Sequence, residues 1–529
     1  MVEEPRHVRY LHAREPGDPL VVQRKWQSVP YREGLGRNPV MNDTGKSDKP
    51  VVPTKLQNKT RQAEDAVEGR GLTKGNSQQQ SRFRTQSRAD LSQALERVRE
   101  AAKREKGQRF TALLHHVTED RLWQAYQTMR RDAAAGTDGQ TWKQYGGEGL
   151  EVRLKELHSR LHRGAYRAKP TRRVYIPKPD GRQRPLGIAS LEDKIVQRAV
   201  ADVLNAIYET DFLGFSYGFR PGRSQHNALD ALTVALYRKK VNWVLDADIR
   251  GFFDAIDHGW LRRFVEHRVA DKRILRLLQK WLRAGVMEEG VVKQTREGTP
   301  QGATISPLLA NIYLHYVLDI WVQWWRRRHA AGEVIIVRYA DDFVIGFQYR
   351  SDAERLHRQL RQRLNKFALE LNESKTRLIE FGCFAASNRQ KRGEGKPESF
   401  VFLGLRHICG KTRNGKFCLV RRSAQDKMRS TLQIVKAELY RRRHQSVPEQ
   451  GLWLQRVVRG YFAYHAVPTN INALKAFRWW VIWYWHRALR RRSQRDRTTW
   501  ARVTKYAERW LPRPRILHPW PSERLHVMT

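Results

Sequence analysis

Two adjacent carboxylates, Asp341 and Asp342, stand between two apolar runs of the chain. Residues 334–338 and 343–347 are rich in β-branched and aromatic side chains, which predicts a β-hairpin with both acids at its turn. Two like charges held side by side away from water are costly unless a positive charge offsets them. A divalent metal ion such as Mg²⁺ would supply that charge, and a solvated acidic turn is the alternative.

A second apolar run, residues 243–247, ends on the carboxylate of Asp248. Two-metal phosphoryl transfer uses carboxylates from separate strands that bridge ions roughly 3.5–4 Å apart. One ion activates the attacking hydroxyl, and the other neutralises charge on the leaving phosphate. Asp248 would complete such a set with Asp341 and Asp342. Spacing alone leaves three nearby acids open as competitors, namely Asp246, Asp254 and Asp257.

Three further segments combine glycine or proline with cationic or amide side chains. Residues 176–187 predict a hairpin around a Pro-Asp-Gly turn, where Lys and Arg would clamp a triphosphate. Residues 214–224 would bring a glycine-rich backbone and two arginines, Arg220 and Arg223, to phosphates. Residues 298–309 predict a helix capped by Ser306 behind a Pro-Gln-Gly stretch. Taken alone, each segment is explained as well or better by an ordinary turn, loop or helix start.

The composition is strongly basic and points to a polyanionic partner. The 529 residues include 100 Lys and Arg against 54 Asp and Glu, a formal charge of +46. Nucleic acid is the expected partner, because each neutralised phosphate releases condensed counterions. A basic membrane-surface protein is the alternative, and the lack of a long apolar segment or signal peptide argues against it. The cysteines, Cys383, Cys409 and Cys418, predict neither a zinc module nor a disulfide framework, so we expect a reducing cytoplasm.

The pattern of the chain changes twice. Residues 1–90 are polar and basic and are predicted to be disordered, with order beginning near Leu91. Mixed strand and helix patterns then extend to about His407, which predicts an α/β or α+β body, and we take α+β as the fold class. From about residue 421 the pattern is helical and rich in Trp, Tyr and Arg.

One helical face in this last region carries Phe477, Val481, Tyr484 and Ala488. The arginines beside this face are Arg490, Arg491, Arg492, Arg495 and Arg497. These arginines predict an RNA-binding surface, with an exposed helix end as the alternative.

The order of these motifs resembles the reverse transcriptases of bacterial group II introns, the intron-encoded maturases. The resemblance covers roughly residues 110 to 500. Its motifs are residues 136–139, 176–187, 218–224, 248–254, 300–307, 339–342, 371–372, 375–376 and 402–405.

The resemblance implies a right-hand polymerase followed by an all-helical thumb. Fingers are expected at residues 91–235, a palm at 236–408, a thumb or maturase (X) domain at 421–510, and a basic tail at 511–529. The implied function is RNA-directed DNA polymerase, which also binds its intron RNA and assists splicing and mobility. The implied cofactor is a pair of Mg²⁺ ions. Expected partners are intron RNA, an RNA template with a DNA primer, dNTPs and target DNA, with no membrane and an unassigned oligomeric state. The expected location is the bacterial cytoplasm, at the nucleoid when the protein is bound to DNA.

The resemblance also implies roles for single residues. Asp248, Asp341 and Asp342 would bind the metal ions, which selects Asp248 over its acidic neighbours. Phe253 would lie under the sugar of the incoming nucleotide and exclude a 2′-hydroxyl. The remaining substrate contacts would be Lys178 and Arg184 to the triphosphate, Gln301 to the nucleotide or template, and Lys375 to primer or product.

Two other functions share these motifs. One is a splicing-only RNA-binding maturase, against which the intact carboxylates and cations argue. The other is a domesticated reverse transcriptase in DNA repair or phage defence, which the polymerase motifs do not distinguish. Many relatives end in an HNH endonuclease domain with cysteine pairs, and this chain lacks such pairs. We therefore expect no cleavage of target DNA by this chain and a primer supplied from elsewhere, such as a replication fork.

Overall fold

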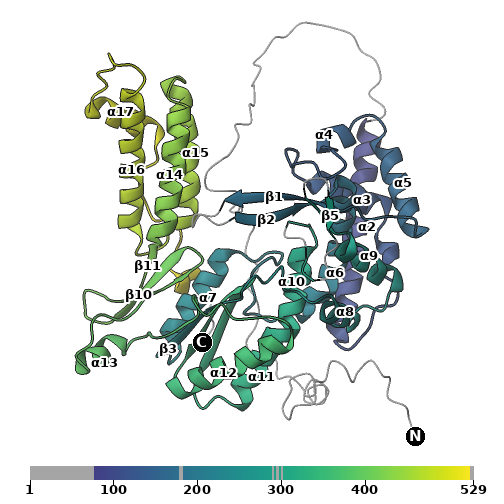
Figure 1. Cartoon of the computed structure of the whole chain (residues 1–529), viewed down its shortest axis with the longest axis horizontal. Helices are drawn as coiled ribbons and strands as arrows, with labels where there is room; N and C mark the ends of the chain where they lie inside the picture. Colours follow the sequence, from purple (N-terminus) through teal and green to yellow (C-terminus); the bar gives the residue numbers. More distant parts are fainter. Residues whose placement is uncertain (1–76, 178–182, 289–290, 294–296, 300–301, 525–529) are drawn as a thin grey trace.

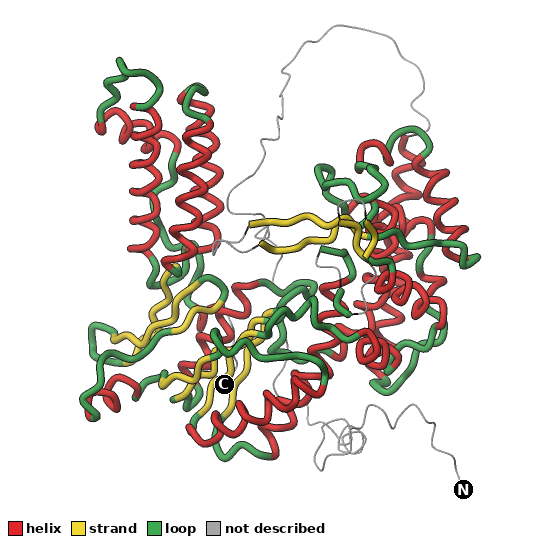
Figure 2. The backbone as a smooth tube through the Cα atoms, viewed as in Figure 1, coloured by secondary structure: helices red, strands yellow, loops and turns green. Residues whose placement is uncertain are grey.

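The computed structural model describes residues 77–177, 183–288, 291–293, 297–299 and 302–524. Figure 1 shows a helical lobe at the N-terminal end of this part, a central region built on a sheet, and a separate set of C-terminal helices. The colouring by secondary structure in Figure 2 makes the same division visible, with strands in the middle and helices at either side. The predicted α+β class is confirmed.

The N-terminal lobe consists of helices packed around apolar residues such as Leu122, Leu157 and Ile195. Its first helix begins at Ser77, before the predicted start of order near Leu91. Residues 77–90 contain neither glycine nor proline, so nothing in the sequence interrupts the helix there. The predicted disorder of residues 1–76 lies outside the described residues. The elements are α2 (Ser77–Arg104), η1 (Leu114–His116), α3 (Glu119–Thr128), α4 (Trp142–Tyr145), α5 (Leu150–His162) and α6 (Leu191–Asp211).

A small sheet projects from this lobe toward the centre of the molecule (Figure 1). Its strand order is β2-β1-β4-β5. Strands β1 and β2 form the antiparallel hairpin predicted at residues 176–187, and Ile176 pairs with Arg184. Strands β4 and β5 come from much later in the chain, inside the range predicted as palm, and β4 joins β1 in parallel. The elements are β1 (Thr171–Pro177), β2 (Gln183–Ile188), α8 (His258–Glu266), α9 (Lys272–Arg283), β4 (Val286–Glu288) and β5 (Val291–Lys293).

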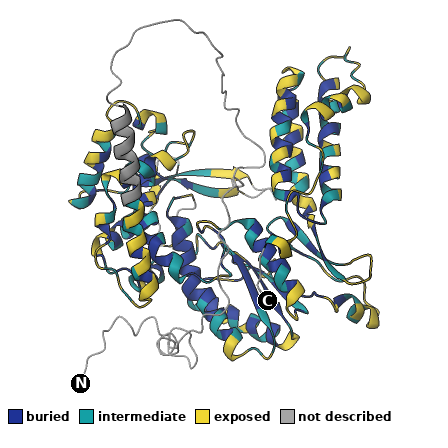
Figure 3. Ribbon diagram, turned by 180° about the vertical axis from the view of Figure 1, so that it is seen from behind, coloured by how far each residue is buried: buried dark blue, intermediate teal, exposed yellow. Residues whose placement is uncertain are grey.

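The central sheet is antiparallel, with strand order β6-β7-β3-β8. Successive residues of β3 face two different cores: Val244 packs with helix α7, and Leu245 packs with helix α12 and with the helical residues 306–328. Because both faces are covered, the strands read as nearly continuous apolar runs. Figure 3 shows this burial as dark blue strands between helices. The elements are α7 (Gln225–Arg238), β3 (Trp243–Asp248), β6 (Val334–Tyr339), β7 (Asp342–Phe347), α12 (Arg350–Lys366) and β8 (Arg377–Glu380).

One continuous helical rod packs against one face of this sheet. It consists of α10 (Ser306–Leu314), a π-helical turn η2 (His315–Asp319) and α11 (Ile320–Arg328). The predicted N-cap at Ser306 is wrong by one position, since Ile305 is the N-cap and Ser306 is the first helical residue. Pro307 is therefore the second helical residue, still within the first turn, where the backbone N–H that proline lacks would have no partner in the helix.

A third sheet, of strand order β11-β10-β9, leads into the C-terminal helices. These helices have their own core, in which Phe477, Val481 and Trp485 are completely buried. The predicted apolar face of residues 477–488 is therefore confirmed. The elements are α13 (Ala385–Lys391), β9 (Phe400–Phe402), β10 (Leu405–Lys411), β11 (Phe417–Ser423), α14 (Gln425–Arg441), α15 (Val447–His465), α16 (Ile471–Arg490), α17 (Trp500–Trp510) and α18 (Pro521–Arg524).

The tail after α17 returns to the central region rather than ending at the helices. Arg524 lies 2.9 Å from Asp230 of α7, and Asp230 also pairs with Arg421 of β11 at 3.3 Å. The described part of this tail ends with the short helix α18. Across the described ranges, no helix has the length and apolar character needed to cross a bilayer.

Candidate active site

Asp341 lies at the tip of the hairpin formed by β6 and β7. Tyr339 pairs with Asp342 across the hairpin, so the tip consists of Ala340 and Asp341. Ala340 has φ +56°, in the left-handed region that non-glycine residues rarely adopt. The predicted hairpin is confirmed, and its turn is tight and conformationally unusual.

Asp248 is brought to the same place by the neighbouring strand. Strand β3 pairs with β7 so that Asp248 stands directly opposite Asp342. Residues in such positions of an antiparallel pair have Cβ atoms about 4.5–5.5 Å apart. The three carboxylates predicted from separate runs of sequence thus meet at one edge of the central sheet.

These carboxylates stand in each other's negative field. The pKa of Asp342 is raised to about 7, first by the surrounding protein, which displaces water, and then by the charges of Asp341 and Asp248. The side chain of Asp342 is nevertheless exposed at the edge of the sheet, so an approaching cation has access to it. The pKa of Asp341 is also raised, again mainly by desolvation. The donor set therefore favours a positively charged ligand.

The three competing acids differ from Asp248 in their contacts and register. Asp257 caps helix α8 by accepting a hydrogen bond from the backbone of Trp260 at 2.6 Å. Asp246 lies 3.6 Å from Arg377 of β8. Its pKa is raised to about 6 by burial, with Arg377 acting in the opposite direction. Asp254 is exposed in the turn after β3. Only Asp248, among these four acids, stands opposite Asp342 in the strand register.

Lys375 contacts the carboxylate set directly. Its Nζ atom lies 2.7 Å from Oδ2 of Asp248, and the side-chain amide of Asn372 donates to the same oxygen at 3.0 Å. The backbone N–H of Asn372 also donates to the Asp248 carbonyl at 2.8 Å. No role is predicted for Asn372 from the sequence, although it lies in a motif of the resemblance. Its double contact with Asp248 makes it part of the site.

Of the remaining predicted substrate residues, two lie in the described part of the chain and two do not. Arg184 is exposed on β2, and its charge lowers the pKa of Asp341, which places it near the hairpin tip. Phe253 is half-buried and meets Phe219 edge-to-face, with ring centroids 6.5 Å apart. Phe219 is therefore a neighbour that the sequence did not single out. Lys178 and Gln301 lie outside the described residues.

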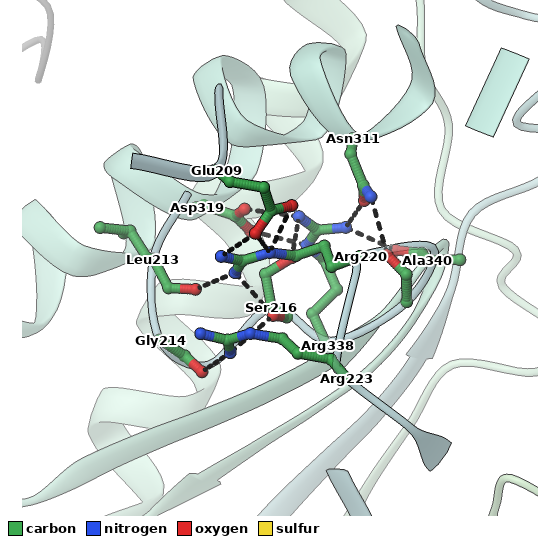
Figure 4. A network of polar contacts seen from close by, with 11 residues as sticks. Glu209, Leu213, Gly214, Ser216, Arg220, Arg223, Asn311, Asp319, Arg338 and Ala340 are labelled. Atoms are coloured by element: carbon green, nitrogen blue, oxygen red, sulfur yellow. Dashed lines mark hydrogen bonds and ion pairs between the residues drawn. The ribbon is translucent and has the colours of Figure 1, made fainter. Parts of the chain in front are cut away.

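Arg220 and Arg223 hold their own loop together instead of facing outward to phosphates. Arg220 is buried and forms a two-pronged ion pair with Glu209, with its closest contact at 2.9 Å. Arg223 donates to the carbonyls of Gly214 and Ser216 at 2.6 and 3.1 Å (Figure 4). The interpretation of Arg220 as a phosphate ligand is wrong, because its charge is already neutralised inside the protein.

An open groove of about 330 Å³ runs beside the carboxylates. Its lining includes Asp246, Asp248, Asp342, Lys375, Phe402 and Leu403. The hydroxyl of Tyr464, on α15, donates to the Leu403 carbonyl at 2.7 Å, which connects the C-terminal helices to this lining. Among the described residues, no group of three or more His, Cys, Asp or Glu side chains is already arranged to hold a metal ion. The salt bridge from Lys375 occupies one of the Asp248 oxygens that such a cluster would use.

The C-terminal arginines are divided between solvent and the fold. Arg492 is half-buried and donates to the backbone carbonyl of Gln445, in the turn between α14 and α15. The other four, Arg490, Arg491, Arg495 and Arg497, are exposed. Exposed indole rings lie on the same helix and on α17, at Trp479, Trp480 and Trp500.

Comparison with known proteins agrees with this geometry. Residues 176–407 match the family described as reverse transcriptase (RNA-dependent DNA polymerase). The chain is 34% identical to protein YkfC of Escherichia coli over 313 residues, which are 53% of this chain and 78% of YkfC. It is 33% identical over 301 residues to the group II intron-encoded protein LtrA of Lactococcus lactis. This chain belongs to the group II intron reverse transcriptases and maturases.

The extent of the similarity differs among members of this reverse transcriptase family. The match to LtrA covers 56% of this chain and 49% of LtrA, so this reverse transcriptase spans about half the length of that relative. A shorter match, 30% identical over 112 residues, is to the nuclear intron maturase 2 of Arabidopsis thaliana, and it covers 20% of this chain. The region that matches the family model, residues 176–407, includes all three predicted catalytic carboxylates, Asp248, Asp341 and Asp342.

Proposed function

We propose that this protein is an RNA-directed DNA polymerase that binds its own intron RNA and assists the splicing and mobility of that intron. The observation that carries the proposal is the strand register that sets Asp248 opposite Asp342, with Asp341 at the adjoining tip, inside the region that matches reverse transcriptases. Membership of the group II intron family supports the intron RNA as partner.

We assign the parts of a right-hand polymerase as follows. The N-terminal lobe and the sheet β2-β1-β4-β5 would be fingers, the central sheet would be palm, and α14 to α17 would be the thumb. Because β4 pairs with β1, residues 286–293 belong with the fingers in space although they fall within the predicted palm range. This division supports a template and primer lying between the lobes and beside the carboxylates.

The carboxylates would hold two divalent ions, for which Mg²⁺ is the proposed species. Bound there, the ions would supply the positive charge that nucleotidyl transfer needs at the attacking hydroxyl and the leaving phosphate. The raised pKa of Asp342 supports this proposal, because a carboxylate that is desolvated and stands beside two other carboxylates is stabilised by a cation. Lys375 would release the Asp248 oxygen that it holds and then contact the primer or the product.

Two further contacts orient the incoming nucleotide in this proposal. Arg184 would bind the triphosphate from the β2 side of the tip, together with Lys178 and Gln301. Phe253, braced by Phe219, would lie against the sugar and exclude a 2′-hydroxyl. The exposed arginines after α16 and the indoles beside them would bind intron RNA by charge and stacking.

The two activities can be separated in one experiment. Asp342→Asn removes a charge at the sheet edge but leaves the C-terminal helices untouched. Purified variant and wild type are compared for extension of a DNA primer on RNA and for splicing of the intron RNA that flanks the gene. We expect the variant to lose extension and keep splicing. Wild-type protein that neither extends the primer nor accelerates splicing would refute the proposed function.

A further inference from the structure

Arg338 is buried completely just below the hairpin tip. It lies on β6 and has 0% exposure, as does its partner Asp319 at the end of the π turn η2. Nothing in the site described above uses either side chain. Burying a charge without water is expensive unless it is paired and fully hydrogen-bonded.

All five N–H donors of this guanidinium find an acceptor (Figure 4). Nε and Nη2 donate to the two carboxylate oxygens of Asp319 at 2.7 and 2.5 Å. Nη2 also donates to Oγ of Ser216 at 2.7 Å, and Nη1 donates to Oδ1 of Asn311 at 3.1 Å. The fifth bond, from Nη1 at 2.9 Å, reaches the backbone carbonyl of Ala340.

The bond to Ala340 connects the buried pair to the site. Ala340 immediately precedes Asp341 and has a left-handed backbone that costs an alanine on the order of 1–2 kcal/mol. On its other side lies Gly218, where an added Cβ atom would stand only 2.2 Å from the Ala340 nitrogen. The side-chain amide of Asn311 donates to the Gly218 carbonyl at 2.7 Å. Ala340, the residue before Asp341, thus has its carbonyl bonded to the guanidinium and its nitrogen against the Gly218 backbone.

The π turn allows one helical rod to supply two of these contacts. Asn311 and Asp319 are eight positions apart in the chain. In a regular α-helix of about 3.6 residues per turn, they would differ by about 80° around the axis. The wider turn at His315–Asp319 takes up that rotation, so both side chains reach Arg338. Such turns are frequent at functional sites.

We propose that Arg338 and Asp319 are positioning residues that fix the peptide before Asp341 and so set the direction in which its carboxylate binds a divalent ion. This inference rests on the proposed polymerase function. Without the guanidinium, the Ala340 carbonyl loses its partner and the tip can leave the left-handed conformation. The competing explanation is that the pair stabilises only the fold.

A double variant distinguishes these explanations, because an apolar pair of similar size often replaces a buried ion pair without loss of stability. Full-length Arg338→Met/Asp319→Leu is compared with wild type and with Asp341→Ala. Three quantities are measured: the unfolding temperature, Mn²⁺ affinity by electron paramagnetic resonance with primer–template present, and the single-turnover extension rate. We expect a near wild-type unfolding temperature, with Mn²⁺ affinity and extension each reduced roughly tenfold or more.

A matched double variant controls for loss of a buried pair as such. Arg268, just after α8, and Asp211, at the end of α6, form a comparable pair, 3.2 Å apart with 1% and 10% side-chain exposure. Arg268→Met/Asp211→Leu should leave Mn²⁺ affinity and extension within about twofold of wild type, the residual effect expected when distant sites act independently.

A second test leaves the ion pair intact and moves the tip directly. Gly218→Ala would drive its methyl group against the Ala340 backbone, whereas a Cβ atom at Gly214 meets nothing within 4 Å. We expect Gly218→Ala to weaken Mn²⁺ binding and Gly214→Ala to leave it unchanged. Wild-type Mn²⁺ affinity in both Gly218→Ala and the Arg338→Met/Asp319→Leu variant would overturn the inference. Failure of the proposed function itself would appear differently, as extension by Asp341→Ala equal to that of wild type.

Discussion

The Nζ atom of Lys375 lies 2.7 Å from Oδ2 of Asp248, although the two residues are 127 positions apart in the chain. The Lys375 side chain is about half exposed, while the Asp248 side chain is only 17% exposed. The lysine therefore approaches the carboxylate from the open groove, where nucleic acid would lie in the proposed complex. Its charge also lowers the pKa of Asp341 and Asp342, in opposition to the desolvation that raises both.

Replacing Lys375 with Gln tests the importance of that charge. A hydrogen bond to a charged group contributes about 1.5–3 kcal/mol, so we expect extension to slow by roughly 10- to 100-fold. Single-turnover extension at saturating dNTP measures the effect. Lys391→Gln, an exposed lysine on α13, provides the control. Equal rates for Lys375→Gln and wild type would show that the charge of Lys375 has no part in the reaction.

Phe253 is expected to select the sugar. Phe253→Val shortens the side chain that Phe219 braces, so the site gains room for a 2′-hydroxyl. The ratio of ribonucleotide to deoxyribonucleotide incorporation should rise by about tenfold or more, in line with the ~1–3 kcal/mol that pocket shape contributes to selectivity. Single-nucleotide extension on one primer–template gives this ratio. Phe384→Val, at an exposed position on a distant loop, should leave it unchanged. A constant ratio in Phe253→Val would remove this residue from the sugar site.

The exposed C-terminal arginines are expected to bind phosphates. Changing Arg490, Arg491, Arg495 and Arg497 to Gln should flatten the dependence of intron-RNA affinity on salt. If all four contact phosphates, the slope of log affinity against log salt should fall by roughly 3, at about 0.7 per contact to single strands. Arg492 is left in place because it bonds within the fold.

The arginine substitutions need a control elsewhere on the surface. Arg350, Arg358 and Arg361 are exposed on α12, which lies away from the C-terminal helices in Figure 1. Their replacement by Gln should change the slope much less per charge removed. Equal slopes for the C-terminal variant and wild type would mean that those arginines are merely solvated.

Buried histidines predict how stability depends on pH. Burial lowers the pKa of His315, His226 and His407 to about 3 each, and that of His465 to about 4. An unfolded histidine binds a proton near pH 6.5, so acid favours the unfolded state. The stabilising effect is fully present above about pH 6.5 and is lost as the pH falls toward 4. The unfolding temperature should therefore fall over this range.

His315 offers a direct test of that pH dependence. Its ring is fully buried and packs edge-to-face against Phe212, so His315→Phe retains an aromatic ring without a proton site. The variant should lose less stability between pH 6.5 and 4 than wild type does. His444→Gln, an exposed control, should follow the wild-type curve. An identical pH profile for His315→Phe would contradict the role assigned to burial.

The strands that carry the acids could be predicted from the sequence because their signal is local. The apolar runs around Asp341 and before Asp248 predicted β6, β7 and β3, and residues 176–187 predicted the β1–β2 hairpin. Contacts between distant residues could not be predicted in this way. The contact between Asp248 and Lys375 depends on the pairing of β8 with β3. A single arginine in an apolar strand, Arg338, does not indicate that its partner is Asp319.

Local chemistry also misled in identifiable places. Arg220, in a loop rich in glycine and aromatics, reads as a phosphate ligand until Glu209 is seen to neutralise it. In the sequence, Arg492 is one of a uniform basic run. In the structure, the other arginines of that run are exposed, whereas Arg492 donates to the Gln445 carbonyl. In both cases a partner supplied by tertiary packing decides the role of the charge.

The carboxylate set is the central claim, and primer extension by Asp341→Ala on an RNA template tests it most directly. The matched control is Asp254→Ala, which removes an exposed acid from the turn after β3. We predict that Asp341→Ala loses at least about a thousandfold in extension rate, as expected when metal-assisted stabilisation of several kcal/mol is removed. Its intron-RNA affinity and unfolding temperature should stay near those of wild type, and Asp254→Ala should extend normally. Undiminished extension by Asp341→Ala would contradict the assignment of this site.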